Sequence, residues 1–192
     1  MKIGVLAVQG AFIEHEHIIE KIGHEVVEIR QRKDLDGIDG IILPGGESTV
    51  QGQLLRKLDM LATIKSLIAD GLPTLATCAG LILLAGHIDN DDSVHIGTLP
   101  VTVKRNAYGR QLGSFVRTAP MKGFDEFPMI FIRAPYISSI KDNVDVLAAV
   151  NDRIVAVQYN NQIGLAFHPE LSGDTRIHEY FISVSYTHLT LP

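Results

Sequence analysis

One cysteine, Cys78, is the side chain of this sequence with the clearest potential for nucleophilic chemistry. It follows a brief strand expected over residues 73–77, and a helix expected over 79–85 begins directly after it. A nucleophile on such a sharp strand-to-helix turn is exposed at the top of a sheet, and the small neighbours Ala79 and Gly80 permit the strained backbone. The helix N-terminus also lowers the pKa of a thiol placed there. An inert buried cysteine is the alternative at this point.

A histidine that could activate this thiol lies far along the chain, in His168-Pro169-Glu170. If the segment continues the strand expected over 164–167, alternation places His168 and Glu170 on one side of it. The carboxylate would then orient the imidazole, and the other ring nitrogen would accept the thiol proton. A lone histidine at a strand end is more often structural. The nearby carboxylate and the cysteine on its turn favour a catalytic arrangement here.

The third candidate is a loop, Pro44-Gly45-Gly46-Glu47-Ser48-Thr49, at the start of another expected helix. Without Cβ atoms, its backbone N–H groups can approach an acyl oxyanion closely. A plain tight turn is the alternative. No Gly-Lys-Ser/Thr follows the loop, and no Gly-x-Gly-x-x-Gly follows the first expected strand, so nucleotide binding is disfavoured.

Strands and helices alternate along the first half of the chain, and the second half is rich in expected strands. Ser48 and Gln51 fit a capping box for the helix after the glycine loop, and Asp174 or Ser172 caps a last helix over 175–183. The pattern predicts an α/β fold with a three-layer architecture, in which helices cover both faces of a mostly parallel or mixed central sheet. The expected strands are 3–8, 25–30, 40–43, 73–77, 101–103, 113–117, 129–132, 146–150, 154–159 and 164–167.

Composition narrows the class of protein. The 192 residues are 46% hydrophobic and 20% charged, which suits one globular domain with a sizeable core. The net charge of −5 and the scattered basic residues give no nucleic-acid footprint. No apolar run approaches the roughly 18 residues of a membrane helix and no signal peptide precedes the first strand, so a cytoplasmic location without membrane partners is expected. A single cysteine excludes an internal disulfide and a multi-thiolate zinc site.

Taken together, these residues resemble the triad glutamine amidotransferases of class I, whose fold is flavodoxin-like, and among them the family of glutaminase subunits of pyridoxal 5′-phosphate synthase. The resemblance covers about residues 1–182 and rests on five ordered motifs: Ala7–Ala11, Pro44–Thr49, Arg105–Gln111, Phe131–Pro135 and Phe167–Glu170. It predicts a single glutamine amidotransferase domain over 1–182. Residues 183–192 lack the charge usual at this end of related chains, and we interpret this atypical tail as a cloning or sequencing remnant and leave it out of the fold prediction.

The resemblance implies hydrolysis of L-glutamine to L-glutamate and ammonia through a cysteine thioester. Cys78 would be the nucleophile, His168 the base and later the acid, and Glu170 its orienting partner. The ammonia would pass to the synthase subunit in a hetero-oligomer for the biosynthesis of pyridoxal phosphate. No cofactor and no metal is implied for this chain. Because such subunits are typically poorly active alone, we also expect the Gly45–Gly46 peptide to reorient when the synthase subunit docks.

The same resemblance assigns an oxyanion hole to the backbone N–H groups of Gly46 and Ala79. A substrate with both an α-carboxylate and an α-ammonium group needs cationic and anionic partners, which arginine and glutamate side chains supply. A set of surface ion pairs is the alternative interpretation of these charges. The residues that match the family's glutamine-binding positions are Gly46, Glu47, Ser48, Arg105, Ile132 and Arg133.

Three rival functions stay open. A glutaminase of another amidotransferase, such as imidazole glycerol phosphate synthase, would share the triad but not the segments 105–111 and 131–135. A cysteine hydrolase or peptidase of related fold commonly has histidine directly after the cysteine, where this chain has Ala79. A binding module without activity requires that the triad does not assemble.

The remaining histidines and an acidic cluster receive non-catalytic interpretations. His15 and His17 lie two apart on an expected helix and point apart, so both are assigned to a solvated face and not to a metal. Residues 89–92, Asp-Asn-Asp-Asp, lack the glycine and terminal glutamate of a calcium loop and are interpreted as an exposed turn. No partner is predicted for His24, His87, His95, His178 and His188.

Overall fold

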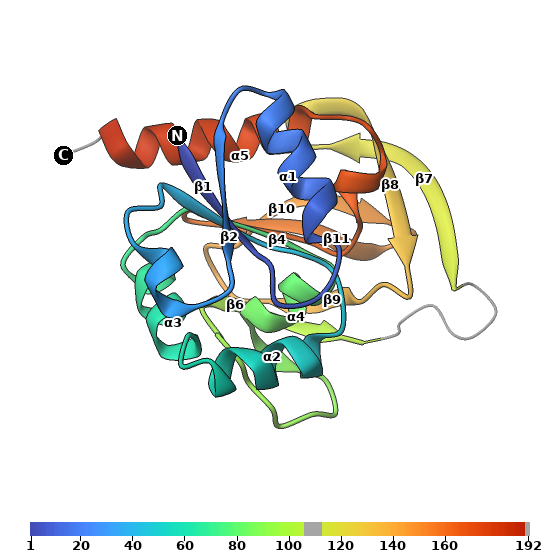
Figure 1. Ribbon diagram of the computed structural model, residues 1–192. Helices are drawn as coiled ribbons and strands as arrows, with labels where there is room; N and C mark the ends of the chain where they lie inside the picture. The colour runs from blue at the N-terminus through green and yellow to red at the C-terminus, as the bar shows by residue number, and fades with distance from the viewer. Residues whose placement is uncertain (106–112, 191–192) are drawn as a thin grey trace.

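The computed structural model describes residues 1–105 and 113–190 of the chain. Helices cover both faces of a central sheet (Figure 1). One face carries α1 (Phe12–Lys21) and α5 (Arg176–Thr190), and the other carries α2 (Ser48–Lys57), α3 (Leu61–Ala69) and α4 (Ala79–Leu84). This three-layer arrangement confirms the predicted fold class.

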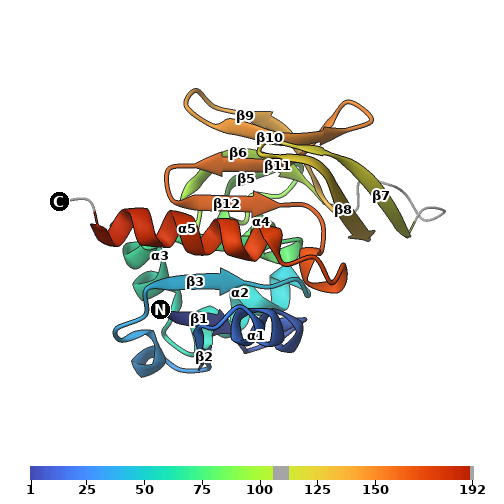
Figure 2. The ribbon, with the colours of Figure 1, turned by 90° about the horizontal axis from the view of Figure 1, so that it is seen from above.

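The N-terminal half of the sheet is parallel. Its strand order is β2-β1-β3-β4-β12, and every pair of neighbours in it runs parallel. Figure 2 shows this half below and the antiparallel half above, with α5 crossing in front. The strands are β1 (Lys2–Leu6), β2 (Glu25–Ile29), β3 (Gly40–Leu43), β4 (Thr74–Thr77) and β12 (Gln162–Leu165), and the short 3-10 helix η1 (Arg32–Leu35) follows β2.

The C-terminal half of the sheet continues from β12 through β11, β9, β6 and β5, with β10 paired to β11. The strand β9 runs antiparallel to both of its neighbours, β11 and β6, whereas β5 and β6 are parallel. A separate antiparallel hairpin is formed by β7 and β8. The bounds are β5 (Ala85–Ile88), β6 (Leu99–Lys104), β7 (Ser114–Met121), β8 (Phe124–Ile132), β9 (Tyr136–Ile140), β10 (Asp145–Val150) and β11 (Arg153–Tyr159).

Two strands were not predicted. The segment 87–93 was expected to be a polar loop, but its beginning belongs to β5, where His87 pairs with Thr102 of β6. The second is β9, which fills the place between β6 and β11. Neither segment has a continuous apolar run, because β5 exposes its two central residues and β9 is only partly buried. Strand pairing made with distant segments therefore decides their structure.

The central strands are mostly apolar because helices cover them on both sides. All four residues of β3, of β4 and of β12 are buried, so these segments do not alternate between apolar and polar positions, and the polar residues among them are Thr74, Thr77 and Gln162. The core extends toward the hairpin through aromatic rings: Phe167 packs 6.0 Å from Phe127 and 5.8 Å from Phe131 of β8, measured between ring centroids. These ring contacts hold β8 against the turn that follows β12.

The last helix is longer than predicted. It was expected to end at residue 183, whereas α5 continues to Thr190 and so includes most of the segment that was left out of the fold prediction. Ser185 is buried on this helix, and its hydroxyl donates to the carbonyl oxygen of Phe181 at 3.0 Å. The interpretation of residues 183–192 as a remnant stays a prediction.

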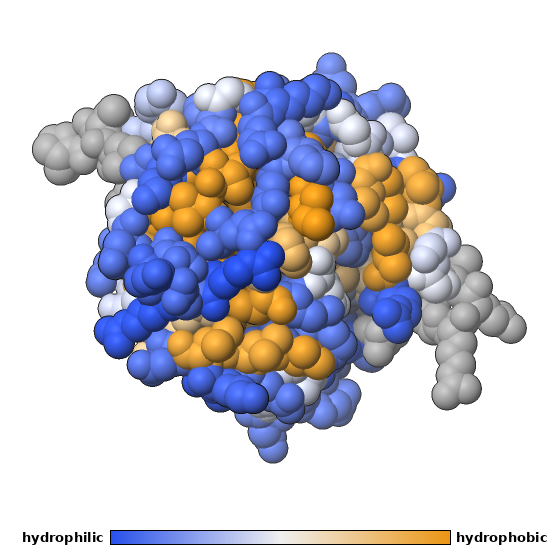
Figure 3. All heavy atoms as spheres, in the orientation of Figure 1, coloured by the Kyte–Doolittle hydropathy of each residue, from blue (hydrophilic) through white to orange (hydrophobic). Residues whose placement is uncertain are grey.

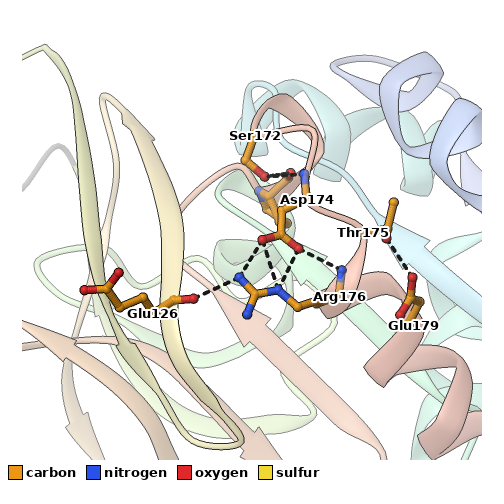
Figure 4. Close-up of polar contacts among 7 residues, drawn as sticks. Glu126, Ser172, Asp174, Thr175, Arg176 and Glu179 are labelled. Atoms are coloured by element: carbon orange, nitrogen blue, oxygen red, sulfur yellow. Dashed lines mark hydrogen bonds and ion pairs between the residues drawn. The ribbon is translucent and has the colours of Figure 1, made fainter.

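A network of polar contacts ties the start of α5 to the hairpin (Figure 4). The Asp174 carboxylate accepts hydrogen bonds from the backbone N–H of Arg176 at 3.0 Å and from its guanidinium at 2.6–3.1 Å. The same guanidinium donates to the carbonyl oxygen of Glu126 on β8 at 2.8 Å. Asp174 thus accepts a hydrogen bond from a backbone N–H group in the first turn of α5, the capping role that the sequence predicted for Asp174 or Ser172. The contact with Glu126 also fixes the segment between His168 and α5 against the hairpin.

The surface shows apolar side chains over the hairpin. In Figure 3 they form the orange area on the right, where Figure 1 places β7 and β8. Val116 of β7 is 66% exposed and Ile132 of β8 is 36% exposed. Among the described residues, no helix combines the length and the apolar character needed to cross a membrane.

Candidate active site

Cys78 lies on a strained turn between β4 and α4. Its backbone adopts φ 48° and ψ −102°, a conformation that costs energy for any residue other than glycine and persists where function requires it. The backbone N–H of Cys78 donates to the carbonyl oxygen of Leu165 at 2.8 Å, which anchors the turn to the neighbouring strand β12. The residue is 7% exposed and its sulfur faces the carbonyl oxygen of Ile132, 4.0 Å away.

The glycines around this turn are required by close packing. A Cβ atom on Gly80 would lie 2.0 Å from the carbonyl oxygen of Leu43, so only glycine lets α4 begin this close to β3. A Cβ atom on Gly45 would lie 2.4 Å from Cε1 of His168. The glycine loop is therefore packed directly against the Cε1 side of the imidazole, and it helps to define the position of the ring.

His168 and Glu170 are joined by a short hydrogen bond, but not through an extended segment. Nδ1 of His168 donates to Oε1 of Glu170 at 2.7 Å, and both side chains are buried. The prediction that they follow one another along a strand was wrong, because Pro169 begins the 3-10 helix η2 (Pro169–Leu171). Proline has the φ of a first helical residue, so it favours the start of a helical turn here. The turn brings the carboxylate back to the ring.

The environment of His168 favours its charged form. Burial lowers the pKa of His168, whereas hydrogen bonding with Cys78 and with Glu170, and the negative charges of both, raise it to about 10. The structure thus brings together two side chains that are 90 positions apart in the sequence, Cys78 and His168. At neutral pH this raised pKa favours the imidazolium form of His168.

A cavity of about 530 Å³ opens onto these residues. Its volume suits a small polar molecule. Every residue predicted for the oxyanion hole and for glutamine binding lines this cavity, together with Cys78 and His168, while Glu170 lies behind the imidazole. The lining residues among the predicted set are Gly46, Glu47, Ser48, Cys78, Ala79, Arg105, Ile132, Arg133 and His168.

The glycine loop is held by groups that the sequence did not indicate. The carbonyl oxygen of Gly45 accepts a hydrogen bond from the backbone N–H of Ala11 at 3.0 Å. The side chain of Gln9 accepts from the backbone N–H of Glu47 at 2.9 Å, and the buried Gln51 amide donates to the carbonyl oxygens of Gln9 at 3.0 Å and Pro44 at 3.3 Å. This network gives the loop one defined shape in the structure.

Glu47, and not Ser48, caps α2. Its carboxylate accepts from the backbone N–H groups of Thr49 at 3.3 Å and Val50 at 2.8 Å, so the predicted capping box of Ser48 and Gln51 was wrong. The reason is tertiary: Gln51 is buried against the glycine loop and its amide is engaged there. Glu47 nevertheless stays at the cavity wall, where its carboxylate is exposed.

Arg105 reaches the cavity from the end of β6. Its guanidinium lies 3.2 Å from Oδ2 of Asp91 and 3.5 Å from the hydroxyl of Thr49. The acidic segment 89–92 was interpreted as an exposed turn, but Asp91 in fact anchors this arginine. Residues 106–111 of the motif that begins at Arg105 lie outside the described residues.

The site contains two histidines that the sequence analysis missed. His15 and His178 are fully buried, and Nε2 of His15 lies 3.4 Å from Oε2 of Glu170. The assignment of His15 to a solvated face was wrong, whereas His17 is exposed as predicted. A clue was present in the sequence, because His15 stands three residues before Ile18 and four before Ile19, at the spacing of the buried stripe of α1.

Comparison with known proteins gives a consistent result. A family model described as the SNO glutamine amidotransferase family matches residues 5–186. A protein of Desulfitobacterium hafniense (strain DSM 10664 / DCB-2) named "Pyridoxal 5'-phosphate synthase subunit PdxT" is 58% identical over 183 residues, which are 95% of this chain and 92% of that protein. A protein of the same name from Streptococcus pneumoniae (strain ATCC 700669 / Spain 23F-1) is 51% identical over 188 residues, covering 96% and 97%.

The architecture also matches a solved structure. A protein described as "Crystal structure of glutamine amidotransferase" superimposes with a TM-score of 0.92 at 38% sequence identity, over 96% of this chain and 98% of the other. A TM-score this high over nearly the whole of both chains shows that the two share one fold.

Proposed function

Because this chain belongs to the SNO glutamine amidotransferase family, we propose that it is the glutaminase subunit of pyridoxal 5′-phosphate synthase. It hydrolyses L-glutamine to L-glutamate and ammonia and delivers the ammonia to the synthase subunit. The observation that carries this proposal is the convergence of Cys78 and His168, which Glu170 holds from behind, on one cavity that is also lined by charged groups suited to an amino acid. The similarity to proteins named as subunits of this synthase supports the choice of partner.

The first half of the reaction forms a thioester. The Cys78 thiolate attacks the side-chain amide carbon of glutamine while His168 is protonated, a state that its raised pKa of about 10 favours at neutral pH. The tetrahedral intermediate then collapses, and His168 gives its proton to the leaving nitrogen, which departs as ammonia. Glu170 keeps the imidazole oriented throughout, because its carboxylate holds Nδ1 at 2.7 Å.

The second half releases glutamate. Water takes the place of ammonia, His168 accepts its proton, and the hydroxide attacks the thioester carbonyl carbon. The thiolate leaves as glutamate forms, so the enzyme returns to its starting state. In both halves the negative oxygen of the intermediate is assigned to the backbone N–H groups of Gly46 and Ala79, and loss of one such donor costs about 10²–10³ in turnover.

Charged groups at the cavity wall explain why the substrate is an amino acid. We assign the α-carboxylate of glutamine to the guanidinium groups of Arg105 and Arg133 and its α-ammonium group to Glu47. All three residues line the cavity. Asp91 supports this assignment, because its ion pair with Arg105 keeps the guanidinium at the end of β6. Gly46, Ser48 and Ile132 complete the predicted contacts.

Delivery of ammonia explains the need for a partner. Free ammonia is protonated in neutral water and then is no longer a nucleophile, so a hetero-oligomer with a closed path to the synthase subunit protects the product. We place this assembly in the cytoplasm. The carbonyl oxygen of Gly45 is held by Ala11 in the structure, and the proposed reorientation of the Gly45–Gly46 peptide on docking would break this hydrogen bond.

The test is an assay of glutamate formed from L-glutamine by the full chain, with and without the synthase subunit of pyridoxal 5′-phosphate synthase. We expect activity that rises with this synthase subunit and not with the synthase subunit of another amidotransferase. Replacing Cys78 by Ala should abolish it, whereas replacing the exposed His17 by Leu should leave it unchanged. A chain that folds and binds the synthase subunit but forms no glutamate would refute the proposal.

A further inference from the structure

Two buried histidines stand behind Glu170, on the side away from the cavity. Nδ1 of His15 on α1 lies 2.9 Å from Nε2 of His178 on α5. Nε2 of His15 lies 3.4 Å from Oε2 of Glu170 and 3.3 Å from the hydroxyl oxygen of Thr77, the residue before the proposed nucleophile. The rings of the pair are 5.2 Å apart between centroids and tilted by 54°. The pair therefore connects two helices of one face to the active-site turn.

Within the part of the chain that the structure describes, the second carboxylate oxygen of Glu170 lacks a hydrogen-bond donor, and the histidine pair places one near it. Oε1 is engaged by His168, but Oε2 is buried and has no hydrogen bond of regular geometry among the described residues. Nε2 of His15 lies 3.4 Å from this oxygen. A buried carboxylate oxygen without a donor is unfavourable and weakens the charge on which an imidazolium depends. Such contacts often tighten only when substrate is bound.

The positions of the protons follow from the chemistry of the acceptors. An ionised carboxylate only accepts hydrogen bonds, so Nε2 of His15 carries the proton of that ring. Nδ1 of His15 is then an acceptor, and Nε2 of His178 donates to it. In this arrangement Nδ1 of His178 carries no proton, which suits a buried atom for which no hydrogen-bond partner is present among the described residues. The donors thus point in one direction, from α5 to Glu170.

Both rings are neutral at neutral pH. Burial, together with the charges of His178 and His168, holds the pKa of His15 well below its usual range, and burial lowers the pKa of His178 to about 4. A neutral donor orients a carboxylate without cancelling its negative charge. A cationic His15 would compete with His168 for the charge of Glu170 and would make His168 a weaker base.

We propose that His15, held in place by His178, is a positioning residue that orients Glu170 and preserves its charge for His168. The inference rests on the proposed glutaminase function and extends the catalytic arrangement by two buried residues. His15 does not touch the cavity, so its effect is expected on turnover and not on the binding of glutamine.

The test compares four variants of the full chain, assayed with the synthase subunit: His15→Leu, His15→Gln, His178→Leu and the control His17→Leu. We expect His15→Leu to lower kcat about ten- to a hundredfold with little change in KM, as loss of a hydrogen bond to a buried charge predicts. His15→Gln, whose amide nitrogen takes the place of Nε2, should keep kcat within about threefold. His178→Leu should lower kcat several-fold, because it leaves His15 in place and removes only its support.

A pH profile separates positioning from a general loss of structure. The titratable groups that face one another here are Cys78, His168, Glu170, His15 and His178. In His15→Leu the alkaline limb of kcat/KM, which reports the His168 imidazolium, should move to lower pH by about one unit for a tenfold effect. In His15→Gln and in His17→Leu it should stay in place.

Two results would overturn the inference: His15→Leu with the kcat and the alkaline limb of the unmodified chain, or a folded His15→Gln that loses as much activity as His15→Leu. Should His15→Leu fail to fold, His15→Gln and His178→Leu decide the question by the same criteria. If the unmodified chain forms no glutamate, the proposed function itself fails and this inference falls with it. An active chain whose His15 variants are unaffected leaves the proposed function intact and refutes only the positioning role.

Discussion

Replacing Glu170 by Gln keeps the shape of the side chain and removes the negative charge beside His168. In the unmodified chain burial lowers the pKa of His168, but hydrogen bonding with Cys78 and Glu170 and the two negative charges raise it from 6.5 to about 10. The rise corresponds to roughly 5 kcal/mol in favour of the imidazolium form, shared between the two partners. The substitution removes the share that Glu170 contributes.

The magnitude follows from the short contact between Nδ1 of His168 and Oε1 of Glu170, at 2.7 Å. A hydrogen bond to a charged group contributes about 1.5–3 kcal/mol, so kcat should fall roughly 10- to 150-fold if this bond acts mainly in the transition state. The amide nitrogen of Gln would also lie near Nε2 of His15, at the place of Oε2 in the unmodified chain, so that two donors would face each other. We therefore expect a loss toward the upper end of this range.

Glutamate formation in the presence of the synthase subunit measures the effect, with kcat and KM determined separately over a range of pH. The alkaline limb of kcat/KM should move to lower pH, because the pKa of His168 falls when the carboxylate is absent. Replacing the exposed Glu14, which also lies at the cavity wall, by Gln provides a charge-matched control. If Glu170→Gln retained kcat within twofold and kept its alkaline limb, the assigned role of this carboxylate would be wrong.

Three further predictions concern the backbone and the buried histidines. Gly80→Ala places a Cβ atom 2.0 Å from the carbonyl oxygen of Leu43, so urea unfolding should show a loss of about 1–3 kcal/mol in the free energy of unfolding. Gly113→Ala, whose Cβ would meet none of the described residues within 4 Å, should be neutral, and equal stability of the two variants would contradict the packing argument. Gly46→Ala, whose Cβ would lie 2.5 Å from Oε1 of Gln9, should abolish the stimulation by the synthase subunit, and full stimulated activity in this variant would rule out a reorienting Gly45–Gly46 peptide. Burial lowers the pKa of His178 from 6.5 to about 4, so the unfolded chain binds a proton at this histidine at higher pH than the folded chain does. The free energy of unfolding should therefore fall by up to about 3 kcal/mol as the pH drops from 6.5 to 4. If the stability of a His178→Leu chain fell as steeply over this range, another group would be responsible.

Local sequence was sufficient to identify the elements that carry the site. The short runs before the glycine loop and before Cys78 predicted β3 and β4, because a strand covered on both faces is mostly apolar and does not alternate. The small residues after Cys78 predicted the turn, and the structure shows why Gly80 is needed there. Residue types at fixed short spacing also indicated the imidazole and carboxylate of His168 and Glu170. These features depend on neighbours in the chain, which a single sequence displays.

Features that depend on which segments become neighbours were decided only by the tertiary structure. The strand β9 and the end of β5 have no distinctive pattern of their own and form because β6 lies between them. Glu47 replaces Ser48 as the cap of α2 because Gln51 is drawn into the glycine loop. In each case a contact with a distant segment outweighs the local preference.

The same division holds within the site. The sequence by itself determined which side chains could act as nucleophile, base and orienting group, since chemistry resides in residue type and in the local turn. Only the strand order placed Cys78 beside His168, by setting β4 next to β12. Only the packing of α1 and α5 on one face buried His15 and His178 behind Glu170. The physical reason is that propensity acts between residues close in the chain, whereas burial and the pKa of a group depend on every segment that surrounds it.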